Sequence, residues 1–552
     1  SGAVGVFINY GQAINKGTIS VEKDGTANSD SVGIYSANGS EVTNEGTVDV
    51  SGNNGIGILG MAHRTDATNN PILNEFGTAA LGQGKATVLN KGQISLDGAN
   101  ATGIYIKNNN ASATRAAAVG TNDTTGIITL AGNSSTGMSG DKATLENKGT
   151  ININGQKSVG MFAKNFSELK NSGTINLVDG LSENEPNIGM YTNDDNTKIT
   201  NDKDIIGGNN TYGIYGKKVD LNATGKIKVG DNSVGIYSNG QHAAGLLGST
   251  VYLPSGSKIE VGKNQSVGVF TTGTNQIITG DADMKIGDSS YGYVIKGTGT
   301  QLDTNVASGV TLGNDAVYIY SSDTTGNIRN STELTATGNK NYGIYAAGTV
   351  TNLANINFGT GVGNVGMYSI GGGTATNGSA TIHPTITVSG TDTVNKLYGI
   401  GMAAGYLDRS SGTVENFGTI QVTGDESIGM YASGSGSRAI NRGTIELSGK
   451  KTVGMYLDNN AVGENYGVIK TVPNPQNTGI VGVVAFNGSV LKNYGQIIIN
   501  APDSVGVYYK GGSLEEHPGS SITVSGDNSE RTRTTVLTST RKTVRGLEIY
   551  TP

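Results

Sequence analysis

Cysteine and tryptophan are absent from this chain of 552 residues, and it contains only 9 prolines. Without cysteine there is no disulfide, no thiolate metal site and no thiol nucleophile. No apolar run approaches the roughly 18 residues that a membrane-spanning helix requires. The net charge of −6 is mild for this length, and nucleic-acid binding would call for a basic patch or stripe. These absences exclude several classes of enzyme and of binding protein.

Glycine is abundant, at 87 residues, and tyrosine, at 24, outnumbers phenylalanine, at 8. The glycines follow no triplet period, which excludes a collagen-like chain, and the regular apolar segments argue against disorder. Length alone suggests about three or four domains, but a chain of repeats is not bound by that expectation. The composition therefore indicates an all-β protein of extracellular character.

Two short motifs alternate along nearly the whole chain. Copies of the first, typified by Ser31-Val32-Gly33-Ile34-Tyr35, mostly follow one another at about 22 to 33 residues, a period typical of stacked repeats. Its central glycines are Gly33, Gly160, Gly189, Gly213, Gly235, Gly268, Gly343, Gly366, Gly429, Gly454 and Gly506. The second motif, typified by Asn15-Lys16-Gly17-Thr18-Ile19, has its asparagine at Asn15, Asn44, Asn90, Asn147, Asn171, Asn416, Asn441, Asn465 and Asn493.

Both motifs have an apolar period of two, which is typical of strands with one buried face. In the first motif this alternation predicts that Val32 and Ile34 are buried and that Gly33 and Tyr35 face outward. The stretches that join the motifs carry the glycine, aspartate and asparagine of turns, as in Gly230-Asp231-Asn232. No segment shows a capped helical pattern.

A strand pair every 25 residues or so cannot bury its apolar face alone, so successive copies must stack. We therefore predict a right-handed parallel β-helix of roughly 20 coils, about 4.8 Å apart, with two or three short strands in each coil. The asparagines of the second motif are expected to bond along a ladder at one corner. Leucine-rich repeats and propeller blades fit the spacing poorly. Residues 1–525 form this array in the prediction, and residues 526–552 form an irregular coil or tail.

Segments that break the repeat are predicted to leave the solenoid as corner loops, where specificity usually lies. The largest lies between Gly60 and Lys85, and others cover residues 107–135 and 369–396. The first loop supplies the candidate contact patch for a ligand, which consists of His63, Arg64 and Asp66.

The alternation of Val-Gly-Ile-Tyr with Asn-Lys-Gly-Thr-Ile, without cysteine, resembles the passenger of large type V autotransporters of Gram-negative bacteria. The giant fusobacterial outer-membrane adhesins are the most similar, and the resemblance covers about residues 1–525. It implies attachment to host cells or other bacteria through protein receptors or glycans. It also implies that this chain, which opens in mid-array, is a piece of a parent with an N-terminal signal and a C-terminal membrane β-barrel. The family has no universal binding motif to carry over.

The sequence segments that resemble catalytic motifs can all be explained as parts of the repeat. Residues 55–60 match a dinucleotide fingerprint, but no helix follows and the string is another repeat copy. Residues 287–290 read Gly-Asp-Ser-Ser, like a serine protease loop, yet they occupy the turn between repeats. The four histidines, His63, His242, His383 and His517, have no ligand spacing. No catalytic, cofactor-binding or metal-ligating residue is therefore predicted.

Acidic pairs and outward tyrosines remain as open alternatives. Asp281 with Asp283, and Asp194 with Asp195, could serve as the paired carboxylates of a glycoside hydrolase or could be solvated turns. Turn oxygens of this kind also leave a calcium site open. Tyr215, Tyr237 and their counterparts are expected to form a ladder of rings, which either anchors sugars and proteins or only stabilises the sheet.

The sequence thus predicts a non-enzymatic, monomeric fragment of a surface adhesin, exposed on the outer membrane of a Gram-negative bacterium. It has no cofactor and does not bind nucleic acid; its expected partner is a protein receptor or a glycan on a host or bacterial cell. A β-helical polysaccharide lyase or hydrolase is the first alternative, and it requires carboxylates clustered with arginine or lysine in a cleft. A purely structural spacer is the second.

Overall fold

The computed structural model describes residues 2–22, 30–62, 86–109, 118–242, 250–405, 410–473 and 477–534. The chain forms two compact units, Ser1–Thr271 and Thr272–Pro552. Every regular element in the described ranges is a short β-strand. Within those ranges, no helix has the length and apolar character needed to cross a membrane.

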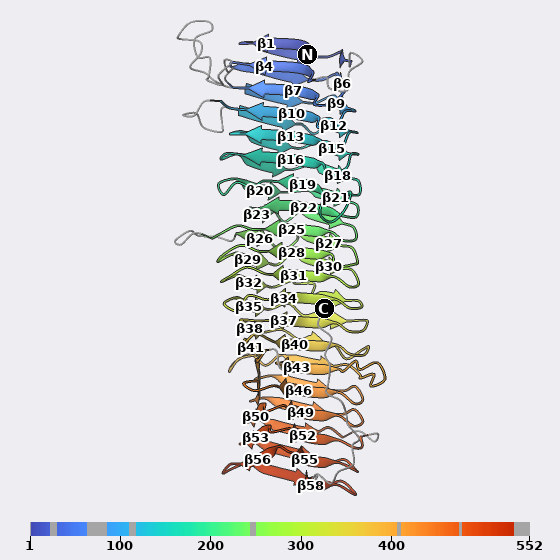
Figure 1. The fold of residues 1–552 in the computed structure, drawn as a ribbon, viewed down its shortest axis with the longest axis vertical. Coiled ribbons are helices and arrows are strands. Elements are labelled where there is room, and N and C mark those ends of the chain that lie inside the picture. Colours follow the sequence, from blue (N-terminus) through green and yellow to red (C-terminus); the bar gives the residue numbers. More distant parts are fainter. Residues whose placement is uncertain are drawn as a thin grey trace. The chain divides into compact units, whose positions relative to one another are not determined.

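Each complete coil contributes three strands, one to each of three faces of parallel strands, which we name faces A, B and C; face C consists of two successive sheets, β3 to β30 and β33 to β57. Face A carries the first motif, face B ends on the asparagine of the second motif, and face C carries the Thr-Ile strand that follows it. Within each unit, the strands of a face lie one coil after another (Figure 1).

The first unit contains three series of described strands. Face A consists of β1 (Val4–Asn9), β4 (Val32–Ala37), β7 (Ile56–Met61), β10 (Thr102–Lys107), β13 (Thr136–Asp141), β16 (Val159–Lys164), β19 (Asn187–Tyr191), β22 (Thr211–Gly216), β25 (Val234–Ser238) and β28 (Val267–Thr271). Face B consists of β2 (Gln12–Asn15), β5 (Ser40–Asn44), β8 (Ala86–Asn90), β11 (Ala118–Asn122), β14 (Thr144–Asn147), β17 (Glu168–Asn171), β20 (Lys198–Asn201), β23 (Lys218–Leu221) and β26 (Val251–Leu253). Face C consists of β3 (Thr18–Val21), β6 (Thr47–Val50), β9 (Gln93–Leu96), β12 (Ile127–Leu130), β15 (Thr150–Ile153), β18 (Thr174–Leu177), β21 (Asp204–Gly207), β24 (Lys226–Val229) and β27 (Lys258–Val261).

The second unit repeats this plan. Its face A consists of β31 (Tyr291–Ile295), β34 (Val317–Ser321), β37 (Tyr342–Ala346), β40 (Val365–Ser369), β43 (Ile400–Ala404), β46 (Ile428–Ser433), β49 (Val453–Asp458), β52 (Val481–Phe486), β55 (Val505–Lys510) and β58 (Glu530–Thr534). Face B consists of β29 (Ile277–Gly280), β32 (Gln301–Thr304), β35 (Asn327–Asn330), β38 (Thr349–Asn352), β41 (Thr374–Asn377), β44 (Thr413–Asn416), β47 (Arg438–Asn441), β50 (Val462–Asn465), β53 (Val490–Asn493) and β56 (Ser513–Glu516). Face C consists of β30 (Asp283–Ile286), β33 (Val310–Leu312), β36 (Leu334–Ala336), β39 (Ile356–Asn357), β42 (Thr385–Val388), β45 (Thr419–Val422), β48 (Thr444–Leu447), β51 (Val468–Thr471), β54 (Gln496–Ile499) and β57 (Ser521–Val524).

Neighbouring coils pair in parallel and in register, so equivalent residues lie directly over one another. On face A of the first unit, Ile34 is paired with Ile58, and Ile58 with Ile104. These isoleucines are almost completely buried, as are Val48 and Ile94 on face C. Because every coil places its branched side chains in the same internal positions, the core is continuous within each unit. The predicted all-β parallel β-solenoid is therefore confirmed, whereas its right-handedness stays a prediction.

The direction of the side chains in the first motif differs from the prediction at the glycine. Ile34 is buried and Tyr35 is partly exposed, as expected. Gly33, however, faces the interior, because a Cβ atom there would lie 2.4 Å from Cγ1 of Val48 on face C. Val32 lies on the outer face, as its position in the coil shares that face with the tyrosine position. Val32 is nevertheless buried, as predicted. The prediction that Gly33 faces outward is wrong, and the simple alternation stops at the glycine.

The predicted asparagine ladder is present in both units. In the first unit each side-chain amide nitrogen donates to the side-chain oxygen of the next coil through Asn15, Asn44, Asn90, Asn122, Asn147, Asn171 and Asn201, with N–O distances of 2.8 Å. In the second unit the ladder runs through Asn330, Asn352, Asn377, Asn416, Asn441, Asn465 and Asn493 at 2.7–3.0 Å. All but Asn15 are buried, so the ladder satisfies polar groups at the face B corner that water cannot reach.

The ladder is interrupted where the asparagine is replaced. In the first unit Asn201 is paired in register with Leu221 and its amide donates only to the backbone oxygens of Lys203 and Lys226. The early coils of the second unit have Gly280 and Thr304 at the corresponding place. Two tyrosines, Tyr293 and Tyr318, lie in the core of those coils, with their ring centroids 5.7 Å apart.

Two of the predicted insertions are shorter than expected. The stretch 107–135 contains β11 and β12, and the stretch 369–396 contains β41 and β42, so both are largely regular coils. The sequence motif is weak there because Gly120 replaces a larger core residue and the glycine-rich turn 371–373 precedes Thr374. The predicted turn at residues 287–290 does join β30 to β31. Within the predicted irregular segment 526–552, β58 pairs with β55, and residues 535–552 lie outside the described ranges.

Candidate functional site

The predicted contact patch of His63, Arg64 and Asp66 lies outside the described residues. The structure therefore gives no geometry for this patch, and its role in binding stays a prediction.

The three described histidines lie in different surroundings. His242 follows β25 in the first unit. In the second unit, Nδ1 of His383 lies 3.0 Å from the backbone oxygen of Phe417, while the ring of His517 stacks on Tyr494 at 4.0 Å. Over the described ranges, no group of three or more histidine and acidic side chains could hold a metal ion.

The carboxylates of the acidic pair Asp194 and Asp195 have different hydrogen-bond and ion-pair partners. Asp194 accepts hydrogen bonds from the backbone nitrogen of Phe166 at 2.6 Å and from the Thr197 hydroxyl at 2.7 Å. Burial raises the pKa of the Asp194 carboxyl, but these hydrogen bonds outweigh it and leave the pKa below its usual value. Asp195 forms an ion pair with Lys217 at 2.7 Å. Both carboxylates are thus engaged in contacts within the protein, and both feel the charge of Lys217.

The pair Asp281 and Asp283 also has separate roles. Burial, with a smaller contribution from the charge of Asp303, raises the pKa of the Asp281 carboxyl. Asp283 accepts a hydrogen bond from the hydroxyl of Ser308 at 2.9 Å.

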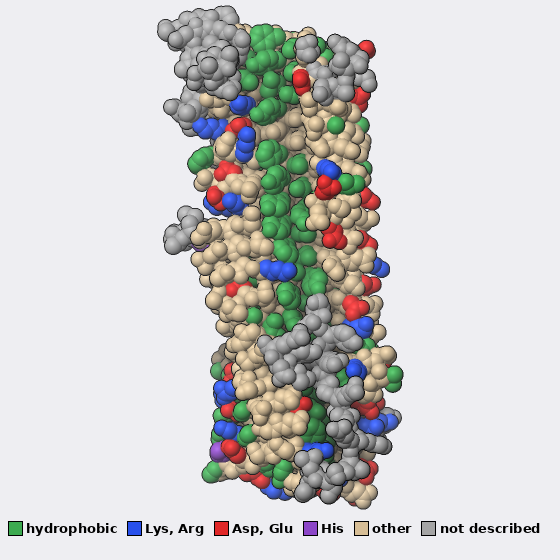
Figure 2. Space-filling view, in the orientation of Figure 1, with side chains coloured by type: hydrophobic (Ala, Val, Ile, Leu, Met, Phe, Trp, Pro, Cys, Tyr) green, Lys and Arg blue, Asp and Glu red, His purple; other side chains and the backbone are tan. Residues whose placement is uncertain are grey.

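The outer surface of face A carries two adjacent columns of side chains. The valine column contains the residue before each motif glycine, and the tyrosine column contains the residue two places after it. In the first unit the valine column is Val4, Val32, Ile56, Thr102, Thr136, Val159, Ile188, Tyr212, Val234 and Val267. The tyrosine column is Phe7, Tyr35, Leu59, Tyr105, Ser139, Phe162, Tyr191, Tyr215, Tyr237 and Phe270. Figure 2 shows the resulting band of hydrophobic side chains over the face A strands of this unit.

From Phe162 to Phe270, the tyrosine column of the first unit is a ladder of rings in contact, as predicted. The ring centroids of Tyr215 and Tyr237 lie 4.5 Å apart at an interplanar angle of 17°, and those of Tyr237 and Phe270 lie 5.3 Å apart at 12°. Burial, together with the charges of the neighbouring phenols, raises the pKa of Tyr215. Such contacts contribute to stability between coils, and the exposed parts of the rings remain accessible.

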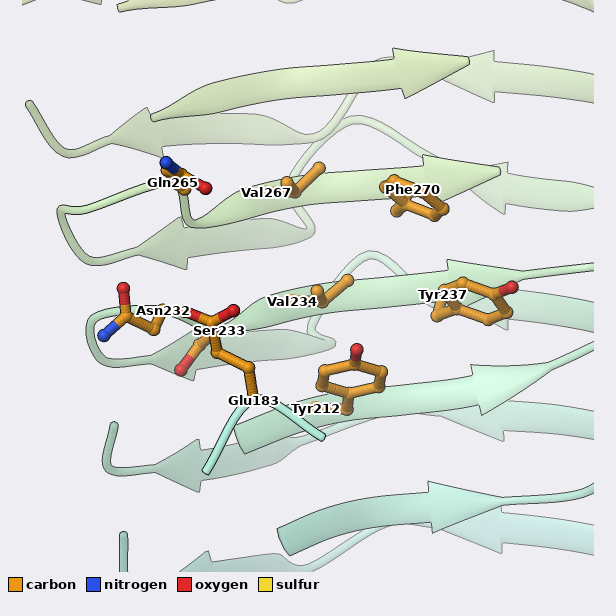
Figure 3. Close-up of a pocket in the computed structure, with 9 residues that line it drawn as sticks. All are labelled: Glu183, Tyr212, Asn232, Ser233, Val234, Tyr237, Gln265, Val267 and Phe270. Carbon is orange, nitrogen blue, oxygen red and sulfur yellow. The ribbon is translucent and has the colours of Figure 1, made fainter. Parts of the chain in front are cut away.

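A pocket of about 200 Å³ opens on this surface, between β22, β25 and β28 (Figure 3). Its apolar lining comes from both columns, and Glu183, from the segment between β18 and β19, lies at its rim. The lining includes Tyr212, Val234, Tyr237, Val267, Phe270 and Glu183. An apolar hollow with a few polar groups at its edge is the usual form of a binding site. The motif analysis predicted the rings but not the pocket.

The same two columns are buried in part of the second unit. Tyr345, Tyr368 and Tyr431 of the tyrosine column and Val365 of the valine column belong to one buried cluster. Tyr398, from the segment between β42 and β43, packs against this cluster. Face A therefore presents an open column surface around β25 and a covered one around β40.

A second column of flat groups lies at the face B corner of the second unit, and the motif analysis missed it. Phe417, Arg442, Tyr466 and Tyr494 occupy the variable place in Asn-x-Gly, and His517 follows Glu516 at the equivalent place. The rings of Tyr466 and Tyr494 stack at 4.6 Å and 3°, His517 continues the stack, and the Arg442 guanidinium lies 4.6 Å from the Tyr466 ring centroid. Alignment of that variable place, where Phe417, Arg442, Tyr466 and Tyr494 follow one another, would have revealed it. The Tyr466 hydroxyl donates to the Glu464 carboxylate at 3.2 Å.

Comparison with known proteins gives one family match. The family model described as the BigA third pectate lyase-like domain matches residues 63–204 and 359–467. One stretch lies in each unit, and together they cover less than half of the chain. The match is therefore similarity in the solenoid repeats, and the words pectate lyase-like describe a fold. No curated protein and no solved structure matches the chain.

Proposed function

We propose that this chain is a non-catalytic adhesin fragment, a β-solenoid stalk that presents binding surfaces at the outer surface of a Gram-negative bacterium. Its partners are protein receptors or glycans on host cells or on other bacteria. The observation that carries the proposal is the open column surface of face A in the first unit, whose side chains are mostly half-buried and form a contiguous apolar band. A contiguous apolar surface that solvent reaches usually marks an interaction site.

Two further features support the proposal. The match to a domain of BigA lies within the solenoid repeats, as a β-helical stalk requires. The in-register pairing and the buried asparagine ladder fix the position of each coil relative to its neighbours, so surface groups are held in place before a partner arrives. A pre-ordered surface loses little conformational entropy on binding.

A polysaccharide lyase or hydrolase is the alternative. It would need carboxylates that converge with arginine or lysine in a cleft. Of the pairs named by the sequence, Asp194, Asp195 and Asp283 each take part in a hydrogen bond or an ion pair within the protein. This favours the adhesin, and a reducing-end assay on pectin and host glycans tests catalysis directly.

The decisive experiment probes arrays of glycans and surface receptors with the purified chain, followed by attachment of chain-coated beads to epithelial and bacterial cells. Deletion of residues 61–84 tests the predicted patch of His63, Arg64 and Asp66. A matched variant, Tyr215→Ser with Tyr237→Ser, tests the open column surface. Loss of binding with either variant supports the adhesin function and identifies the surface. No binding by the unaltered chain to any array or cell would refute it.

A further inference from the structure

Apart from the hydroxyls of Tyr212 and Tyr237, the polar groups of the pocket on face A of the first unit lie on one side. Val234, Val267 and Phe270 form an apolar base, and the polar lining groups lie toward the segment that carries Glu183 (Figure 3). The hydroxyl of Ser233, one of those groups, already donates to the backbone oxygen of Asp231 at 2.9 Å. A ligand of this pocket therefore needs an apolar body with a polar group at one end.

Glu183 provides an unused hydrogen-bond acceptor at that polar side. Across the described part of the chain, its carboxylate takes part in no ion pair and no hydrogen bond, whereas Glu185 of the same segment pairs with Lys157 at 2.6 Å. The Glu183 carboxylate is close enough to Tyr212 that its charge, after burial and the neighbouring Tyr237, helps to raise the pKa of the Tyr212 phenol. A protonated hydroxyl on a ligand would be a suitable donor to this carboxylate.

The second unit shows the chemistry that covers such a surface. There, Tyr398 from outside the face A strands packs against the cluster formed by the two columns. Elsewhere in that unit, the Tyr466 hydroxyl donates to a glutamate carboxylate. The chain thus uses a tyrosine ring on the columns and a phenol-to-carboxylate hydrogen bond within its own fold, and the open pocket offers both contacts at one place.

We propose that this pocket binds a tyrosine side chain of a partner polypeptide, with the ring on Val234, Val267 and Phe270 and the hydroxyl donating to Glu183. Tyrosine is a frequent anchor at protein interfaces because it combines a large apolar area with one polar end. A sugar ring carries hydroxyls around its whole edge and would leave several of them against apolar side chains. This inference rests on the proposed adhesin function and specifies its partner as a protein.

The test uses the full chain with ¹³C-labelled valine methyl groups and small probes of known chemistry. N-acetyltyrosinamide is expected to shift the methyl signals of Val234 and Val267 with a Kd on the order of a few millimolar, as befits a single side-chain contact. N-acetylphenylalaninamide is expected to bind roughly tenfold more weakly, since it lacks the hydroxyl. No shift with either aromatic probe overturns the proposal. Equal shifts with methyl β-galactoside, or with N-acetyllysinamide, also overturn it and identify a sugar or a cation as the ligand.

Two matched pairs of variants separate the pocket from general effects on folding. Glu183→Ala is expected to remove the preference for tyrosine over phenylalanine, and Glu185→Ala is expected to retain it. Val234→Glu is expected to abolish binding of both aromatic probes, while Val159→Glu, at the equivalent place on β16, leaves binding unchanged. Retained preference in Glu183→Ala would overturn the assigned role of that carboxylate.

The two proposals fail separately. If the chain attaches to cells but no aromatic probe reaches Val234 and Val267, the adhesin function stands and the tyrosine pocket is refuted. If the tyrosine probe binds as expected but neither cells nor arrays retain the chain, the pocket stands as a binding site and the adhesin function is refuted.

Discussion

Removing one asparagine from the middle of the ladder should cost more than removing one from its end. In Asn147→Ala, the side-chain oxygen of Asn171 loses its donor, and this buried acceptor is left unsatisfied. In Asn201→Ala, Asn171 loses only an acceptor, and its amide still donates to backbone oxygens. Asn201 has no asparagine beyond it, because Leu221 follows in register.

The difference between the two variants isolates the unsatisfied acceptor. Both side chains are fully buried and the same atoms are removed, so the cavity contribution is matched. An unsatisfied buried polar group costs about 1–3 kcal/mol. Amide hydrogen exchange, measured where it reports local opening, should therefore be about 5- to 150-fold faster around β15 and β18 in Asn147→Ala than around β21 in Asn201→Ala, each relative to the unaltered chain. Equal acceleration in the two variants would refute the ladder's contribution.

Three further predictions concern the core. Tyr293→Phe should stabilise the second unit by about 1 kcal/mol in thermal denaturation. The reason is that the buried Tyr293 hydroxyl has no hydrogen-bond partner among the described residues. A loss of stability would contradict this. Gly189→Ala should destabilise the first unit by more than about 2 kcal/mol, since its Cβ would lie 2.5 Å from the Gly213 carbonyl oxygen. Gly17→Ala, with open space around it, should change the stability by no more than about 0.5 kcal/mol. Similar urea midpoints for the two variants would contradict this. Burial raises the pKa of Tyr318 to about 12, above its value of about 10 in the unfolded chain. Its contribution to stability is therefore complete below pH 10 and is lost between pH 10 and 12, at about 1.4 kcal/mol per pH unit. Phenolate absorbance without loss of structure in that range would contradict this.

The stacking of coils follows directly from the spacing of the motifs. A period of roughly 25 residues, with asparagine at one fixed place, leaves little freedom for a different arrangement, and both the solenoid and the asparagine ladder were predictable. The inward direction of the glycine in the first motif was not predictable. A period of two assigns Gly33 outward, whereas packing decides the matter, because the face C side chain of Val48 occupies the space that a Cβ atom would need.

The candidate site was only partly predictable for the same reason. Outward tyrosines can be read from the motif, and the contact of Tyr215 with Tyr237 follows from the register. The pocket depends on where the irregular segment with Glu183 lies relative to later coils, which no repeat pattern determines. Tyr398 likewise packs against the covered columns of the second unit, and its place before β43 gives no sequence signal for this contact.

The central claim is that each coil lies in register on the next, and engineered disulfides test it most directly because the chain contains no cysteine. Lys226 on β24 and Lys258 on β27 are register partners and both are exposed. Their Cα atoms should therefore be about 4.8 Å apart, within the range a disulfide spans. The account predicts that Lys226→Cys with Lys258→Cys forms an intramolecular disulfide nearly completely under mild oxidation, and that Lys226→Cys with Glu260→Cys, two residues out of register, forms little. Equal yields from the two pairs, or no bridge in the first, would contradict the stacked register on which the proposed stalk and its surfaces depend.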